Sequence, residues 1–236
     1  MHDLAWLTAR PIAHRGLHDM NSKRWENSLS AFQAAVAGNY SIECDVHLSS
    51  DGVPVVFHDH ALRRLTGRHG TVADKTAQEL GALRIGDTED HVPTLHEMLA
   101  VVAGRVPLVI ELKASDGHDD ALVVRVIEAL QSYSGPTALM SFEHRLVRQL
   151  AEQAPGLPRG LTAEGLTRGA IEAHFSMLAH DISFVSYAVN DLPSPFVSFV
   201  RDRLSMPVIT WTVRDREAVD RTAAHADQMT FEGFLP

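Results

Sequence analysis

The chain has 236 residues, of which 45% are hydrophobic and 22% charged, a composition typical of a globular protein and not of a disordered chain. Asp and Glu outnumber Lys and Arg by 30 to 21, so the formal net charge of −9 argues against a nucleic-acid-binding protein. The single cysteine, Cys44, excludes an internal disulfide bond and a cysteine-based zinc site. No stretch approaches the roughly 18 apolar residues that a membrane span needs, and the N-terminus has no signal-peptide pattern. We therefore expect a cytoplasmic protein without stable membrane insertion.

In chain order, short apolar runs rich in Val, Ile and Phe alternate with longer amphipathic stretches. The apolar runs predict strands at 11–14, 41–48, 53–58, 107–113, 136–142, 159–162, 182–188, 207–213 and 227–231. The amphipathic stretches predict helices at 27–37, 94–102, 119–131, 143–153, 167–178, 195–203 and 215–225. This alternation predicts parallel βαβ units, and about eight such strands predict an α/β fold of the (β/α)8 TIM-type barrel class. A doubly wound open sheet is the alternative, but no Gly-x-Gly-x-x-Gly motif follows the first strand.

Two places depart from this alternation. Between the predicted strands at 41–48 and 53–58, the connection through Asp51-Gly52 is too short for a crossover helix and predicts a turn. One of the nine predicted strands is then a hairpin partner or a terminal piece rather than a barrel strand. The polar segment 59–92 is a long connection, and connections of this length are usually functional or have structure of their own. We expect one barrel domain over 1–236, with an insertion at 59–92 after the third strand.

Several predicted strands end in titratable or aromatic side chains. Catalytic residues of (β/α)8 barrels lie at the carboxyl ends of the strands, so we expect these side chains to meet at one mouth of the barrel. They are His14 and Arg15, Glu43 and Asp45, His58 and Asp59, Glu111 and Lys113, and Trp211.

Four of these side chains are carboxylates, and three of the four, Glu43, Asp45 and Glu111, belong to the predicted strands at 41–48 and 107–113. Side chains alternate between the faces of a strand, so Glu43 and Asp45 share one face. Together with Glu111 they would repel one another strongly unless a cation lay between them, and oxygen ligands select a hard ion such as Mg²⁺ or Ca²⁺. The alternative is a buried network in which Arg15 and Lys113 neutralise the carboxylates without a metal. The spacing alone leaves both interpretations open.

Two histidines, His14 and His58, end neighbouring strands and could act as acid and base, because histidine titrates near neutral pH. Arg15 and Lys113 supply the positive charge that an anionic substrate needs, and Arg can bind a phosphate through two hydrogen bonds. Trp211 either stacks on a ligand or packs inside the barrel. Together these residues indicate a metal-assisted hydrolase that acts on a phosphate ester.

An ordered set of short motifs makes this interpretation more specific. The motifs are Ile12-Ala13-His14-Arg15-Gly16, Glu26-Asn27-Ser28, Ile42-Glu43-Cys44-Asp45-Val46, the segment 51–59, Glu111-Leu112-Lys113, Ser141-Phe142 and Thr210-Trp211-Thr212-Val213. With these motifs the chain resembles the glycerophosphodiester phosphodiesterase family over most of its length. One departure lies near the C-terminus, where family members commonly have Thr-Asp followed by a proline and this chain has Phe231 in place of the usual aspartate.

The resemblance implies a barrel with a small inserted subdomain and a role for each site residue. The implied roles are general acid–base catalysis for His14 and His58, metal binding for Glu43, Asp45 and Glu111, and phosphate binding for Arg15 and Lys113, with Glu26 and Asn27 bracing the substrate site and Trp211 lining it. The metal would be Mg²⁺ or Ca²⁺, and the sequence does not decide between them.

The resemblance also implies a reaction. The expected activity is metal-dependent hydrolysis of small-molecule phosphodiesters such as glycerophosphocholine or glycerophosphoethanolamine to glycerol 3-phosphate and an alcohol. One alternative is a lysophospholipase D-like enzyme, which needs an apolar face near the mouth that Leu62, Leu65, Leu83 and Phe142 could supply. Another alternative is a barrel that binds a phosphodiester without cleaving it. The leaving alcohol and the oligomeric state stay open.

Overall fold

A computed structural model describes residues 3–115 and 121–236 of the chain. Its central feature is a closed barrel of eight strands in the order β1-β9-β8-β7-β6-β5-β4-β2, which the pairing of β1 with β2 completes. The strands are β1 (Ile12–Ala13), β2 (Ser41–Leu48), β4 (Leu108–Leu112), β5 (Thr137–Ser141), β6 (Arg159–Ala163), β7 (Phe184–Ala188), β8 (Val208–Val213) and β9 (Gln228–Phe231). Every pairing within the barrel is parallel. The predicted (β/α)8 barrel is therefore confirmed.

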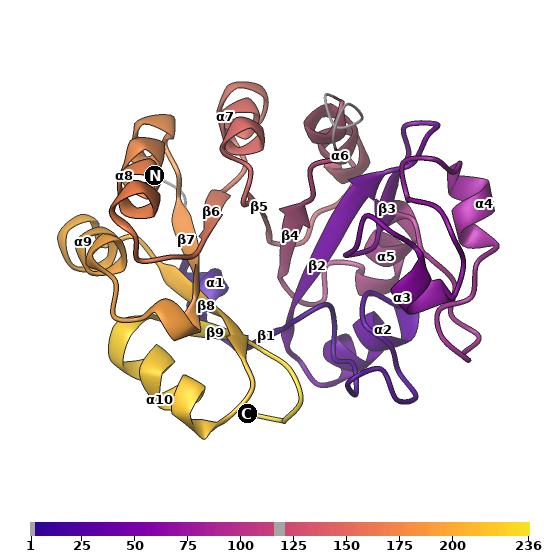
Figure 1. The fold of residues 1–236 in the computed structure, drawn as a ribbon, viewed down its shortest axis with the longest axis horizontal. Coiled ribbons are helices and arrows are strands. Elements are labelled where there is room, and N and C mark those ends of the chain that lie inside the picture. Colours follow the sequence, from indigo (N-terminus) through magenta and orange to yellow (C-terminus); the bar gives the residue numbers. More distant parts are fainter. Residues whose placement is uncertain (1–2, 116–120) are drawn as a thin grey trace.

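Helices surround the barrel and connect its parallel strands (Figure 1). They are α2 (Leu29–Ala37), α5 (Leu95–Val102), α6 (Leu122–Leu130), α7 (His144–Gln153), α8 (Arg168–Ser176), α9 (Pro195–Leu204) and α10 (Arg216–His225), with 3₁₀ turns η1 (Met177–His180) and η2 (Val189–Asp191). Side-chain caps explain several of the helix starts. Thr94 caps α5 in a reciprocal pair with Glu97, and Asp215 accepts a hydrogen bond from the first turn of α10. The predicted start of the helix at 119–131 lies outside the described residues.

The ninth predicted strand is not part of the barrel. β3 (Pro54–Val56) pairs antiparallel with β2 and forms a hairpin on its outer edge. Gly52 occupies the turn with a φ of +77°, a left-handed conformation that favours glycine. The short connection is thus a turn, as the sequence predicted, and β3 is the hairpin partner of β2. The hairpin carries His58 to the mouth of the barrel, because the chain leaves β3 two residues before it.

The segment 59–92 has a small apolar core of its own. It contains α3 (Arg63–Thr66) and α4 (Ala77–Gly81), which lie beside β3 at the edge of the molecule (Figure 1). Its buried side chains pack on Val55 and Phe57 of the hairpin. Leu62 and Leu65 belong to this core, and Leu83 packs against it half-buried. These three leucines therefore do not form the apolar face at the mouth that a lysolipid substrate would need.

Alternation along the strands separates an outer core from the interior of the barrel. Cys44 and Ile110 point outward into the core between the strands and the helices. Val109 points inward and packs with Leu7 of α1 (Ala5–Thr8) near the amino ends of the strands. At the opposite end the inward positions of β2 and β4 are occupied by carboxylates. Among the described residues, no helix is both long and apolar enough to cross a bilayer.

Candidate active site

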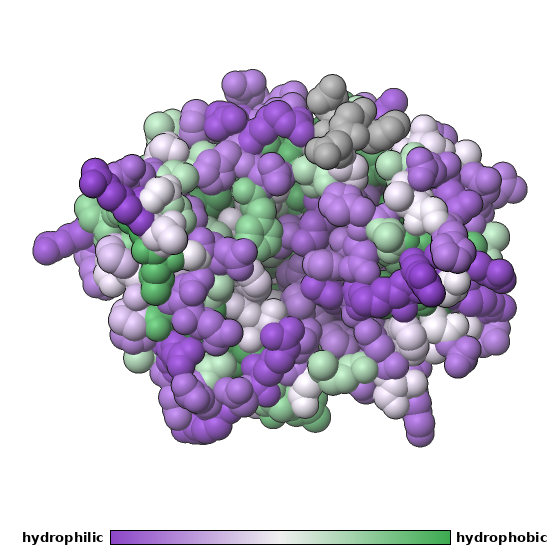
Figure 2. All heavy atoms as spheres, viewed as in Figure 1, coloured by the Kyte–Doolittle hydropathy of each residue, from purple (hydrophilic) through white to green (hydrophobic). Residues whose placement is uncertain are grey.

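A cavity of about 350 Å³ opens at the carboxyl ends of the barrel strands. Figure 2 shows this face of the molecule hollowed near its middle, with hydrophilic residues crowded on the side of the insertion. Most of the predicted site residues line the cavity: His14, Arg15, Glu43, Asp45, His58, Glu111, Lys113 and Trp211. The structure thus brings together side chains from strands that are far apart in the sequence.

Glu43, Asp45 and Glu111 form a compact carboxylate cluster on the floor of the cavity. The strand register explains their proximity, since Asp45 of β2 lies directly opposite Glu111 of β4. All three are buried, and one oxygen from each lies within 4.8 Å of the others. Hard divalent cations bind such sets of carboxylate oxygens. The cluster could therefore hold a metal ion.

Two cations neutralise part of this charge. Lys113 contacts Glu111 closely and lies 3.1 Å from Oδ1 of Asp45. Nε of Arg15 lies 3.3 Å from the other oxygen, Oδ2 of Asp45. The buried ion-pair network that the sequence left open is therefore present, centred on Asp45. Glu43, in contrast, accepts only the backbone N–H of Arg15, at 2.9 Å, among the hydrogen bonds of the described residues.

The pKa values of the three carboxyl groups diverge for this reason. Burial, together with the charges of Asp45 and Glu111, raises the pKa of Glu43 well above its usual range. Burial also raises the pKa of Glu111. Burial acts in the same direction on Asp45, but Lys113 and Arg15 outweigh it and lower the pKa of Asp45. The protein thus leaves negative charge on the cluster incompletely balanced, and a divalent cation fits this donor set.

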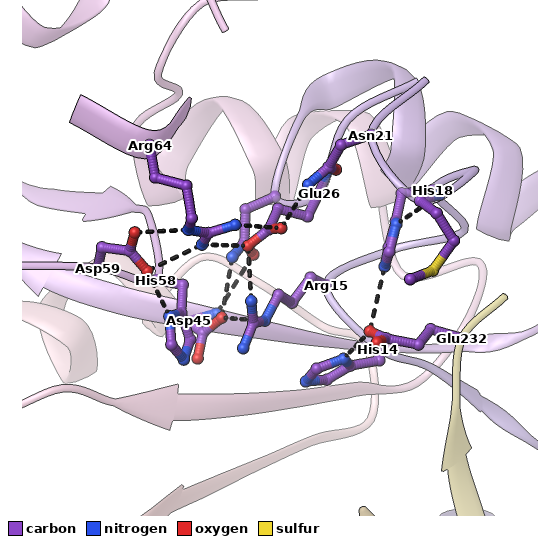
Figure 3. A network of polar contacts seen from close by, with 12 residues as sticks. His14, Arg15, His18, Asn21, Glu26, Asp45, His58, Asp59, Arg64 and Glu232 are labelled. Carbon is purple, nitrogen blue, oxygen red and sulfur yellow. Dashed lines mark hydrogen bonds and ion pairs between the residues drawn. The ribbon is translucent and has the colours of Figure 1, made fainter. Parts of the chain in front are cut away.

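His14 follows β1 and is held by a carboxylate from the other end of the chain. Its Nδ1 atom makes a close hydrogen bond to Oε2 of Glu232, the residue after β9 (Figure 3). Its Nε2 atom lies 3.9 Å from Oε2 of Glu43. Burial lowers the pKa of His14 despite the neighbouring carboxylates. His14 is therefore a largely neutral imidazole near neutral pH, and a neutral imidazole can accept a proton.

His58 has a similar arrangement that is built locally. Its Nδ1 atom is hydrogen-bonded to Oδ1 of the next residue, Asp59, at 2.8 Å. Arg64 of α3 donates to both oxygens of Asp59 and to both oxygens of Glu26, at 2.7–2.8 Å (Figure 3). Burial acts to raise the pKa of Asp59, but the Arg64 and His58 hydrogen bonds lower it to about 2. The insertion therefore contributes directly to the surroundings of His58.

Glu26 and Asn27 lie behind the cavity wall and brace residues that line it. Glu26 accepts a hydrogen bond from Nη1 of Arg15 at 2.6 Å. Asn27 donates to Oδ2 of Asp45 at 2.9 Å. Ser28 serves as the N-cap of α2, so the helix begins at Leu29 and leaves the side chain of Asn27 free for this contact. Glu26 and Asn27 thus contact two residues that line the cavity and do not line it themselves.

The backbone around Arg15 is shaped by a close approach of α2. Arg15 and Gly16 both have positive φ angles, of 54° and 79°. A side chain on Gly16 would lie 2.9 Å from Cβ of Ala31 and 3.0 Å from the ring of Phe32. The His14-Arg15-Gly16 motif therefore needs glycine at its third position, and the resulting turn aims the Arg15 N–H at Glu43.

Trp211 and Phe142 form an aromatic wall on the other side of the cavity. Their rings meet edge to face, with centroids 5.2 Å apart. Trp211 also donates its indole N–H to the carbonyl of Ser186 at 3.2 Å, so its orientation is fixed by the barrel. Phe142 is 37% exposed, and its ring centroid lies 5.8 Å from Nζ of Lys113. Trp211 thus both packs in the barrel and lines the cavity.

Sequence reasoning missed Glu232 and Arg64. The sequence comparison placed the departure from the family pattern at residue 231, but Phe231 faces the outer core, where it packs on Tyr40. Because side chains alternate along β9, the next residue faces the mouth, and Glu232 supplies a carboxylate there. Strand alternation from Thr230, which lines the cavity, was a signal that could have identified Glu232. No sequence signal distinguishes Arg64 from its neighbour Arg63.

A carboxylate cluster with two cations and two carboxylate-linked histidines, at the mouth of a (β/α)8 barrel, is suited to the cleavage of phosphate esters. The profile of the glycerophosphoryl diester phosphodiesterase family matches residues 14–232, and the chain belongs to this family. It is accordingly a phosphoric diester hydrolase.

Individual relatives agree with this membership. The glycerophosphodiester phosphodiesterase of Caldanaerobacter subterraneus subsp. tengcongensis is 29% identical over 222 residues, which cover 89% of this chain and 88% of that protein. The rat lysophospholipase D GDPD1 is 30% identical over 138 residues, 53% of this chain and 42% of that protein. A phosphodiesterase of Oleispira antarctica, solved in complex with the product sn-glycerol-3-phosphate, shares the fold with a TM-score of 0.82 at 24% identity, over 96% of this chain and 94% of that chain.

Proposed function

We propose that residues 1–236 act as one domain that hydrolyses glycerophosphodiesters to sn-glycerol 3-phosphate and an alcohol. The observation that carries the proposal is the convergence of His14, His58 and the carboxylate cluster in one cavity. The family membership and the named activity of the Caldanaerobacter relative support the substrate class. Glycerophosphocholine and glycerophosphoethanolamine are suitable test substrates.

In this proposal Glu43, Asp45 and Glu111 hold Mg²⁺ or Ca²⁺. The ion would neutralise charge on the phosphoryl oxygens and so stabilise the transition state. Arg15 and Lys113 hold the phosphate by charge and hydrogen bonds, since both line the cavity. One histidine accepts the proton of the substrate hydroxyl next to the phosphodiester as its oxygen attacks phosphorus, and the other protonates the leaving alcohol. Water then opens the resulting cyclic phosphate, with the two histidines exchanging roles. Asp59 and Glu232 keep the two imidazoles oriented through their Nδ1 atoms.

The first experiment measures release of glycerol 3-phosphate from glycerophosphocholine with Mg²⁺, with Ca²⁺, with excess EDTA, and by the His14→Ala variant. We expect release with metal, loss with EDTA, and loss in the folded variant. Calorimetric titration with each metal adds a readout that needs no turnover, and Asp45→Asn should weaken the binding of the ion. Release that is unaffected by EDTA would contradict the metal assignment.

A lysophospholipase D-like activity is the second candidate, because the matched rat relative has that name and Phe142 exposes an apolar ring at the mouth. The ratio of activity on glycerophosphocholine to activity on lysophosphatidylcholine separates the two. A ratio well above one supports the glycerophosphodiester substrate, and a ratio well below one supports the lysolipid. Binding of both without turnover would instead indicate a non-catalytic barrel.

A further inference from the structure

Glu232 lies directly after the last barrel strand and is only 8% exposed. Its two oxygens have separate partners. Oε1 accepts a hydrogen bond from Nε of Arg214 at 2.7 Å. Oε2 contacts Nδ1 of His14 and lies 3.4 Å from Nε2 of His18, so two histidines converge on one oxygen (Figure 3).

The proton of His18 can be placed from its other contact. The backbone N–H of Met20 donates to Nδ1 of His18 at 3.1 Å, so this nitrogen is unprotonated. In neutral His18 the proton is therefore on Nε2, which faces Glu232. This nitrogen is buried and makes no hydrogen bond of regular geometry in the described part of the chain, and it lies 3.4 Å from Oε2 of Glu232. A small rotation of the His18 ring would let Nε2 donate to Glu232.

The proton of His14 follows from the charge of Glu232. Burial acts to raise the pKa of Glu232, but the hydrogen bond from His14 and the close approach of His18 outweigh it and hold this pKa well below its usual range. An ionised carboxylate has no proton to donate, so the contact with His14 must be donated by the Nδ1–H group. Nε2 of neutral His14 then carries the lone pair, on the side that faces Glu43 and the cavity.

We propose that Glu232, braced by His18, is a positioning residue that fixes the proton of His14 on Nδ1 and makes Nε2 the nitrogen that exchanges a proton with the substrate. The inference rests on the proposed function, in which His14 works as an acid or a base. A carboxylate on one ring nitrogen selects the tautomer, restrains the rotation of the ring, and stabilises the imidazolium that forms during proton transfer.

A metal ion is the competing explanation for the same three residues. One ligand atom from each of His14, His18 and Glu232 lies within 4.8 Å of the others. The hydrogen-bond interpretation is favoured because Glu232 accounts for both histidine protons without an ion. A tightly bound metal ion would also displace Nδ1 of His14 from its hydrogen bond to Glu232. Titration with Zn²⁺ therefore distinguishes the metal interpretation from the hydrogen-bond interpretation.

The decisive variant is Glu232→Gln. The amide keeps the shape of the side chain but can donate its NH₂ to Nδ1 of His14, which favours the wrong tautomer. We expect kcat for glycerophosphocholine to fall about 10²- to 10⁴-fold, with KM within about threefold of the wild type. Glu232→Asp keeps an ionised acceptor and should retain more of kcat than Glu232→Gln. Glu217→Gln, the same substitution at an exposed residue of α10 outside the cavity, is the matched control.

A spectroscopic measurement tests the contact without turnover. Two-bond ¹H–¹⁵N correlation spectra, recorded above the titration range of histidine, distinguish the two neutral tautomers, and His14→Ala assigns the signal. The wild type should show the Nδ1–H tautomer of His14, Glu232→Gln the Nε2–H tautomer, and Glu217→Gln no change. His18→Phe removes one donor to Oε2 and should lower kcat only about fivefold, the value of one hydrogen bond.

Several results would overturn the proposal. An unchanged kcat in a folded Glu232→Gln variant of an active enzyme would show that the carboxylate does not position His14. An Nε2–H tautomer in the wild type would refute the proton placement. Stoichiometric Zn²⁺ binding that perturbs both His14 and His18 would favour the metal interpretation. A wild-type enzyme that releases no glycerol 3-phosphate, yet shows the Nδ1–H tautomer, would refute the proposed function while leaving the contact in place.

Discussion

His14 and His58 lie at the two ends of one polar network, and each has its Nδ1 nitrogen on a carboxylate (Figure 3). The carboxylate of His58 belongs to the adjacent residue, whereas the carboxylate of His14 comes from 218 residues away. The His58 side chain is 31% exposed and the His14 side chain 11%. One histidine is thus supported by a local turn and the insertion, and the other by the closure of the whole barrel.

The same contact, a histidine Nδ1 on a carboxylate, therefore depends on local structure at His58 and on the complete fold at His14. A contact between adjacent residues forms wherever the turn after β3 forms. A contact between β1 and β9 exists only when the barrel is closed, because these strands pair with each other. Proper orientation of His14 therefore reports on the complete fold, and orientation of His58 reports on the hairpin and the insertion.

The largest expected effect comes from removal of either imidazole. His14→Ala and His58→Ala should each lower kcat on glycerophosphocholine by about 10²- to 10⁴-fold, the usual contribution of general acid–base catalysis. A substrate with a p-nitrophenolate leaving group needs no protonation of that group, so it should restore activity to the variant that lacks the acid. Initial rates on both substrates then assign acid and base. Equal rescue of both variants would contradict a division of roles between them.

A smaller effect, on the stability of the fold, is expected from substitution of Arg64 in the insertion. The pKa of Glu26 lies at about 2 instead of 4.5, because Arg64 and Arg15 outweigh the opposing effect of burial. This lowered pKa stabilises the folded state above pH 4.5, and the stabilisation is lost as the pH falls toward 2. Arg64→Gln should therefore lower the free energy of unfolding at neutral pH by about 2 kcal/mol, a difference that shrinks on acidification.

Urea unfolding across this pH range measures the effect. Arg63→Gln is the matched control, since Arg63 is exposed on the same short helix and does not line the cavity. If the difference in the free energy of unfolding between wild type and Arg64→Gln stays constant as the pH falls toward 2, Arg64 stabilises the protein by packing and not by charge.

The next largest effect is expected at Asp59, the carboxylate that supports His58, and it can be compared with that at Glu232. Asp59→Asn should lower kcat about tenfold, less than Glu232→Gln, because the Asp59 side chain is 24% exposed and water can replace its hydrogen bond to His58. Kinetics of both variants on glycerophosphocholine provide the comparison. A loss in Asp59→Asn that equals or exceeds that in Glu232→Gln would show that exposure does not weaken the support of His58.

The smallest effect is expected at the aromatic wall. Phe142→Ala removes an exposed ring beside Trp211 and should raise KM for glycerophosphocholine about two- to fivefold with little change in kcat. Phe199→Ala, which alters an exposed phenylalanine of α9, is the control. A fall in kcat without a change in KM would instead place Phe142 close to the reacting atoms.

The sequence by itself determined the barrel and much of the site. Alternating apolar and amphipathic runs predict βαβ units regardless of the detailed packing, and strand ends mark the mouth. The positions of Glu43, Asp45 and Glu111 followed from two-residue periodicity and strand order, both of which are local or sequential properties. The short connection before β3 likewise identified the hairpin.

Only the tertiary structure decided which distant side chains support these residues. Glu232 meets His14 because β9 closes the barrel beside β1, and Arg64 rather than Arg63 meets Glu26 because α3 packs in one orientation on the hairpin. Such contacts depend on the relative placement of elements and have no periodicity of their own. The same placement buried Leu62 and Leu65 in the insertion and left Phe142 at the mouth, a distinction that hydrophobicity alone does not contain.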